Sequence, residues 1–137
     1  MKEYNYNDES LLNVKELMDF KRDNPSNGYL KIRASSANEA VPVSELKIRV
    51  YKDIGDYRIV FFEGMTDYSG MINNIVLPSP IGISDDLIAP KFTEYKLEAT
   101  NNLGIKLIYD ISICCSITVI QYINITPNYN EGINYGN

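Results

Sequence analysis

Apolar and polar side chains alternate with a period of two along most of the chain between Gly28 and Pro127. In Tyr29–Ala34, leucine, isoleucine and alanine share one face, and lysine and arginine share the other. The segments Leu46–Tyr51 and Thr93–Ala99 repeat this pattern. Because successive side chains of a β-strand point to opposite faces, each segment predicts a strand with one buried and one solvated face, as is typical of antiparallel sheets.

Four further apolar segments continue the series: Tyr57–Met65, Met71–Leu77, Ile105–Ile113 and Ile117–Ile125. A tight turn at Cys114–Ser116 is predicted to join the last two. The centre of Tyr57–Met65 is continuously apolar, so we expect it to be covered on both sides. About seven short strands separated by regular turns indicate a mainly β fold, a seven-stranded antiparallel β-sandwich.

Helical spacing is found only near the N-terminus. Apolar side chains recur every three or four residues over Glu9–Arg22, which predicts one α-helix. Asn24-Pro25 should end this helix, because the residue before proline resists the α region, and Gly28 permits positive φ. The apolar stripe either packs against the sandwich, which we favour, or docks on a partner. The predicted organisation is a helical extension over residues 1–27, a β-sandwich over 28–127 and a flexible polar tail over 128–137.

Composition excludes several classes of site. The 137 residues include no histidine, which removes the usual Ser-His-Asp and Cys-His mechanisms and the commonest zinc ligand. The only cysteines, Cys114 and Cys115, are adjacent, so they would point to opposite faces of a strand; reduced thiols are favoured over a redox or intermolecular role. The net charge of −5 argues against nucleic-acid binding. No cofactor is predicted.

The sequence also predicts where the protein is found. The N-terminus is polar and has no apolar signal region. The longest apolar stretch, Ile105–Ile125, is interrupted by Lys106 and Asp110 among others, so no membrane span is predicted. We expect a cytoplasmic protein that could later be built into an assembly.

Five segments together resemble a known family: Asn24–Ile32, Ala40–Val43, Phe62–Gly70, Leu77–Pro80 and Ile120–Pro127. They are similar to the transthyretin-like, carboxypeptidase-regulatory-like β-sandwich module. The version they most resemble is found in spore-forming anaerobic bacteria, in small proteins and in the N-terminal region of spore cortex-lytic enzymes. The resemblance implies a Greek-key sandwich and a non-catalytic accessory role, often at an envelope or spore structure.

Cationic side chains occupy outward positions of the first two predicted strands. Lys31 and Arg33 lie on one, and Lys47 and Arg49 lie on the other beside Tyr51. If the two strands shared a sheet, they would form a cationic face with aromatic neighbours that could hold an anionic polymer. In the transthyretin-like arrangement they belong to opposite sheets, which favours an ordinary solvated face.

Asp85 and Asp86 form an acidic pair in the long segment between Pro78 and Lys91. Adjacent carboxylates can hold a hard cation or act as acid and base. No second carboxylate pair is placed near them by the sequence, so a solvated loop is favoured. Loops of this length are usually functional or disordered.

Two classes of function remain. The first is a non-catalytic binding or structural module that contacts a protein partner or a cell-wall polymer and can self-associate through strand edges. The alternative is a small carboxylate-dependent cell-wall glycan hydrolase, or its accessory subunit, which needs two carboxyl groups roughly 5–10 Å apart across a groove. The sequence gives no reason to pair any two carboxylates, so we predict that the chain is not an enzyme.

Overall fold

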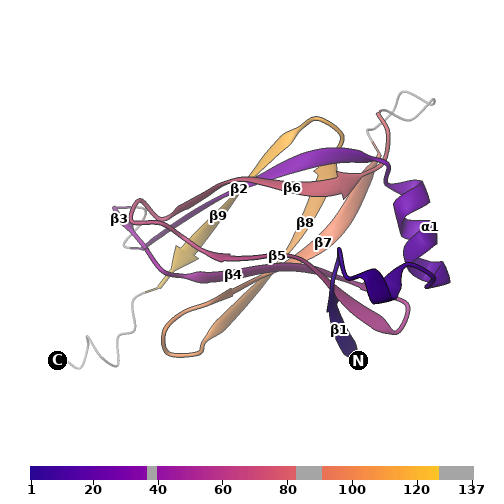
Figure 1. Ribbon diagram of the computed structural model, residues 1–137. Helices are drawn as coiled ribbons and strands as arrows, with labels where there is room; N and C mark the ends of the chain where they lie inside the picture. Colours follow the sequence, from indigo (N-terminus) through magenta and orange to yellow (C-terminus); the bar gives the residue numbers. More distant parts are fainter. Residues whose placement is uncertain (37–39, 83–90, 127–137) are drawn as a thin grey trace.

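Two β-sheets pack face to face, and a short helix covers one end of them (Figure 1). The computed structural model describes residues 1–36, 40–82 and 91–126. Their strands are β1 (Lys2–Asn5), β2 (Ser26–Ser36), β3 (Val41–Pro42), β4 (Lys47–Ile54), β5 (Tyr57–Met65), β6 (Met71–Ser79), β7 (Phe92–Thr100), β8 (Lys106–Cys114) and β9 (Thr118–Ile125). A mainly β fold is thus confirmed.

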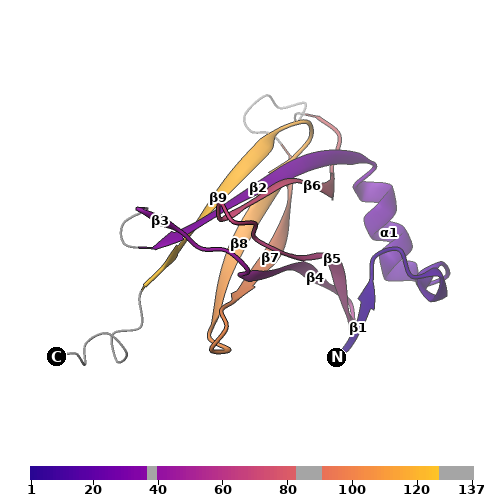
Figure 2. The ribbon, with the colours of Figure 1, turned by 60° about the vertical axis from the view of Figure 1, so that its left-hand side comes forward.

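The strands are divided between a five-stranded sheet A and a sheet B. Sheet A has the order β1-β5-β4-β7-β8, and sheet B is centred on β2, which pairs with β3, β6 and β9. The β1–β5 and β2–β9 pairs are parallel, and the other pairs are antiparallel. Figure 2 shows β9 running alongside β2. Among the described residues, β8 pairs only with β7 and β9 only with β2, so each leaves one edge open.

The prediction of seven antiparallel strands is wrong in count and in orientation. The described residues form nine strands and include the two parallel pairs. The strands β1 and β3 have four and two residues, which is too short for a visible alternation. Strand direction depends on which distant segment each strand meets, and local periodicity carries no information about this.

The alternation itself is confirmed by burial. Leu30, Ile48 and Leu97 are 0%, 1% and 0% exposed, and they belong to one core between the sheets. Lys31 lies between the fully buried Leu30 and Ile32, so its side chain faces outward. Burying such side chains is the main favourable contribution to folding, at about 1.5–3 kcal/mol for each one.

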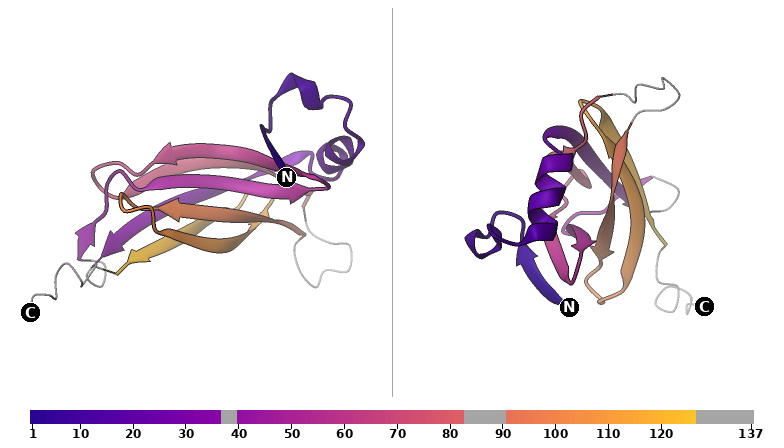
Figure 3. Two further views of the ribbon diagram at one scale, coloured as in Figure 1. Left: turned by 90° about the horizontal axis from the view of Figure 1, so that it is seen from below. Right: turned by 90° about the vertical axis from the view of Figure 1, so that its right-hand side faces the viewer.

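The N-terminal helix is shorter than predicted. A 3₁₀ turn, η1 (Glu9–Leu11), precedes the helix α1 (Lys15–Asp23), in place of one helix over Glu9–Arg22. Asp8 caps the turn by accepting from the Ser10 N–H at 2.9 Å, and Val14 is extended, which separates the two pieces. The helix lies over one end of the sandwich (Figure 3). Leu17 and Phe20 of α1 and Leu11 of η1 are buried in the shared core, as favoured from the sequence.

Gly28 lies inside β2 and does not end the helix, contrary to the prediction. A Cβ atom at Gly28 would lie 2.2 Å from the carbonyl oxygen of Cys114 and 2.5 Å from Cγ2 of Ile113. The glycine is therefore required because β2 passes very close to β8.

An irregularity in β5 explains its continuous apolar run. Tyr51 pairs with Val60 and Val50 with Phe62, so Phe61 is an extra residue on β5. This bulge keeps two successive aromatic side chains on the inner side of sheet A. Phe61 packs with its ring centroid 5.6 Å from that of Phe20 in α1, so the helix packs against this strand.

Candidate functional site

The predicted cationic residues are divided between the two sheets. Lys31 and Arg33 lie on β2 in sheet B, whereas Lys47, Arg49 and Tyr51 lie on β4 in sheet A. The structure therefore does not bring the five together in one patch. Asp85 and Asp86 lie outside the described residues.

On sheet A, Arg49 is surrounded by carboxylates. Its Nη2 donates to Glu3 Oε1 at 2.7 Å, and its Nη1 lies 3.6 Å from Glu98 Oε1. Its Nε lies 3.2 Å from Glu63 Oε2 in a geometry that makes no hydrogen bond, so this contact is electrostatic only. Lys106 Nζ lies 3.8 Å from the other Glu98 oxygen. Glu63 and Glu98 are thus both engaged by one arginine.

The remaining predicted residues of sheet A adjoin this cluster. Tyr51 is only 4% exposed, and the Arg58 guanidinium lies 4.3 Å from the centre of its ring. Arg58 donates to Asp53 at 2.8 Å, and this hydrogen bond lowers the pKa of Asp53. Lys47 lies at the rim of a hollow of about 450 Å³ that Arg49 also lines. Sheet A thus carries charges of both signs, most of them paired.

Sheet B has a different charge pattern. Its strands β2, β3, β6 and β9 contain no aspartate or glutamate, and Lys31 and Arg33 are their only charged side chains. Neither cation has an ion pair with another described residue. A sheet with only positive charge is unusual in a chain whose net charge is −5.

Aromatic and apolar side chains surround these two cations. In the parallel β2–β9 pair, Lys31 lies beside Ile120 and Arg33 beside Tyr122. Ile120 is 47% and Tyr122 is 51% exposed. Together with Tyr29 these residues form what we call the sheet B face. Arginine and lysine flanked by aromatic rings can bind carboxylate or phosphate groups while apolar atoms contact the ligand's carbon skeleton.

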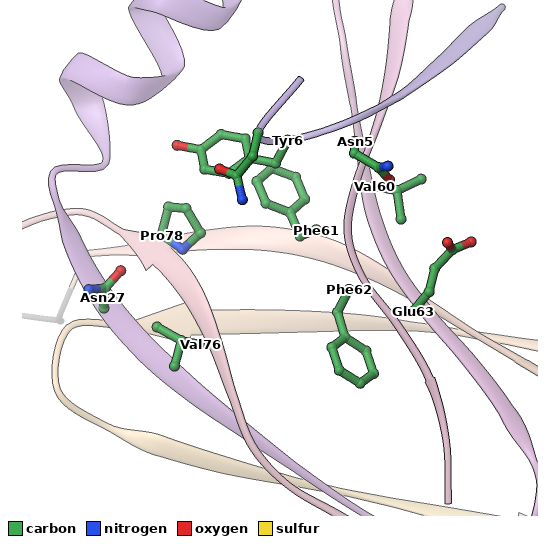
Figure 4. A pocket seen from close by; sticks show the side chains of 10 residues that line it. Asn5, Tyr6, Asn27, Val60, Phe61, Phe62, Glu63, Val76 and Pro78 are labelled. Carbon is green, nitrogen blue, oxygen red and sulfur yellow. The ribbon is translucent and has the colours of Figure 1, made fainter. Parts of the chain in front are cut away.

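A separate cleft of about 520 Å³ lies where the edges of β5 and β6 face each other (Figure 4). One wall comes from β5 and the segment after β1, the other from β2 and β6. The lining residues are Asn5, Tyr6, Asn7, Asn27, Val60, Phe61, Phe62, Glu63, Val76 and Pro78. The alternation of side chains along the strands does not predict this cleft. The Phe61-Phe62 pair, which breaks the alternation, was the available signal for it.

The two cysteines are free and partly buried. Cys115 Sγ lies 3.5 Å from Ser116 Oγ and 3.0 Å from Ser26 Oγ. Three hydrogen bonds lower the pKa of the Cys115 thiol to about 7. The bond with Ser116 contributes most, followed by the bonds with Ser26 and with the Gly82 N–H.

Within residues 1–36, 40–82 and 91–126, no three acidic or cysteine side chains gather closely enough to hold a metal ion. None of the helices in these ranges has the length and apolar character needed to cross a membrane.

Comparison with known proteins gives a fold and no family. The sequence matches no protein-family model, and no curated protein shows a significant match. The fold resembles Klebsiella pneumoniae 5-hydroxyisourate hydrolase, with a TM-score of 0.53 and 13% identity over 74% of this chain and 91% of that one. It also resembles (S)-allantoin synthase, with a TM-score of 0.56 and 11% identity over 81% of this chain and 44% of that one. The chain therefore spans less than half the length of the allantoin synthase.

These similarities correct the prediction that the chain is not an enzyme. That prediction rested partly on treating this fold as an accessory, non-catalytic one, and both similar structures are enzymes by name. The fold is therefore no argument against catalysis. At 13% and 11% identity neither activity carries over to this chain, and neither structure supports a link to spore cortex-lytic enzymes. What the resemblance does establish is that the chain has a transthyretin-like β fold.

Proposed function

We propose that the protein is a binding module that associates with an anionic polymer or an acidic protein surface through the sheet B face. The observation that supports this most is the separation of charge between the sheets. Within the described part of the chain, Lys31 and Arg33 of sheet B make no ion pair, whereas Arg49 and Arg58 of sheet A are paired. An unpaired cation gains more from an incoming anion, because no existing ion pair must first be broken.

The flanking side chains favour a polymer or protein over a small inorganic ion. Tyr122 and Ile120 expose about half of their surface beside the two cations. Tyrosine is enriched where proteins bind other molecules, because it combines a large contact area with a polar group. A bacterial cell-wall polymer or a spore-envelope component, as implied by the sequence resemblance, has the required combination of anionic groups and carbon skeleton.

A sedimentation assay tests the proposal. The protein is mixed with purified peptidoglycan that retains its anionic polymers and, separately, with peptidoglycan from which they have been extracted. Wild-type protein should sediment with the first, and raised salt should release it because screening weakens exposed charge pairs. The double variant Lys31→Gln/Arg33→Gln should bind about tenfold less, since two surface ion pairs together contribute about 1.4 kcal/mol.

The matched control is the double variant Lys47→Gln/Lys52→Gln, which removes the same charge from sheet A. It should sediment like the wild type. A pull-down from vegetative and sporulating cells extends the test to protein partners. The proposal fails if the protein stays in the supernatant and retrieves no partner, or if both double variants lose binding equally.

A further inference from the structure

The edge of β5 is only partly occupied. The strand β1 pairs with β5 over Tyr57–Val60, and the Tyr6 N–H then donates to the Val60 carbonyl at 2.9 Å. From Phe61 to Met65, β5 has β4 on one side and no described strand on the other. On the far side of the cleft, β6 pairs with β2 alone among the described residues. Two strand edges therefore face the cleft shown in Figure 4.

The walls of the cleft combine apolar rings with amide groups. The rings of Tyr6 and Phe61 lie 4.5 Å apart between their centroids, and Phe62 lies further along β5. Asn5 and Asn27 contribute amides from opposite walls. Amide side chains both donate and accept hydrogen bonds, as a peptide backbone requires. An aromatic cleft beside an unpaired strand edge is the arrangement used when an extended peptide adds to a sheet.

We propose that this cleft binds an extended segment of a partner protein, which adds to β5 in line with β1. The interface between β1 and β5 shows that this edge of sheet A accepts a parallel strand, and the proposed guest would continue the same interface. The open length from Phe61 to Met65 accommodates about four or five residues of a strand. Alternate side chains of the guest would enter the space between the rings of Tyr6 and Phe62.

The charge of the cleft lining restricts which segments could bind there. Of the described residues that line the cleft, only Glu63 is charged, and its carboxylate faces Arg49 at 3.2 Å. An acidic guest would be repelled there, so the segment should be neutral or basic with apolar residues at alternate positions. This site does not involve Lys31 or Arg33, and it therefore stands independently of the binding proposed for the sheet B face.

The test uses a displayed library of random eight-residue peptides, selected on the full-length protein. Peptides with alternating apolar residues should be enriched, and a synthetic copy should bind at least tenfold more weakly to Phe62→Ala. A copy with alternate amides N-methylated should lose binding, because strand addition needs those N–H groups. Bound peptide should slow hydrogen exchange of the backbone amides over Phe61–Met65.

Two controls keep the result interpretable. Tyr122→Ser removes a ring of the sheet B face and should bind the peptide like the wild type. If Phe62→Ala does not fold, Asn5→Ala with Asn7→Ala replaces it, with at least a threefold loss expected. The proposal is overturned if no peptide is enriched, if N-methylation has no effect, or if a β-linked N-acetylglucosamine hexamer binds in the cleft and peptides do not.

Discussion

Replacing Gly28 by alanine should strongly destabilise the protein. The new methyl group would lie 2.2 Å from the Cys114 carbonyl oxygen and 2.5 Å from Ile113 Cγ2. Because the first of these atoms belongs to the backbone, β2 and β8 must separate by about 1 Å to restore ordinary contact. Forcing extra volume into a packed interior costs about 1–3 kcal/mol, and a backbone clash belongs at the upper end of that range.

The net change in the free energy of unfolding also depends on how the substitution affects the unfolded chain. Alanine restricts the unfolded state more than glycine does, which returns about 0.4–1 kcal/mol. We therefore expect a net loss of about 2 kcal/mol in the free energy of unfolding and a melting temperature lower by about 5–10 °C. Urea and thermal denaturation followed by circular dichroism measure both quantities.

Gly64→Ala is the matched control. Gly64 is also a strand residue, and its added Cβ would lie 2.7 Å from Cζ of Phe62. That atom is the far end of a side chain that borders the cleft and can turn aside, so we expect a loss below about 1 kcal/mol. Equal destabilisation by Gly28→Ala and Gly64→Ala would refute the argument that close backbone approach requires Gly28.

Two further predictions concern single groups. In a Cys114→Ser background, the rate of alkylation of Cys115 should rise with pH, with a midpoint near pH 7. Ser26→Ala should move this midpoint to higher pH because the thiolate loses a hydrogen-bond donor. An unchanged midpoint would contradict this role of Ser26. Tyr95 is 1% exposed, donates to the Pro78 carbonyl, and has a pKa raised mainly by burial. Tyr95→Phe should lower the free energy of unfolding by about 1–2 kcal/mol by leaving that carbonyl unpaired, and wild-type Tyr95 should not ionise in an alkaline absorbance titration until the protein unfolds.

The sequence predicted the strands well because each is half buried. Leu30, Ile48 and Leu97 were placed inward by alternation alone, and all three are fully buried. The exception is instructive. The bulge at Phe61 interrupts the period of two and places Phe61 and Phe62 on the same side of sheet A, so the continuous apolar run reflects the bulge and not a strand covered on both sides.

The candidate sites were harder to predict because they depend on contacts between distant segments. Lys31 and Lys47 have the same local pattern, and only the assignment of their strands to different sheets separates them. The cleft needs Tyr6, Phe62 and Pro78 together, which are far apart in the sequence. The four residues of β1 do not alternate visibly, so nothing local showed that the N-terminus pairs with β5.

The parallel pairing of β2 with β9 has a consequence for synthesis. On the ribosome, β2 emerges early, but β9, which covers its other edge, follows only after β3–β8 have been made. At roughly 5–20 residues per second this delay is on the order of several seconds. During it, a nascent chain would carry an unsatisfied β2 edge, open to wrong pairing. Pairing between strands so far apart in the sequence raises the contact order of the fold. Proteins of high contact order fold slowly, in milliseconds to seconds once the whole chain has been made.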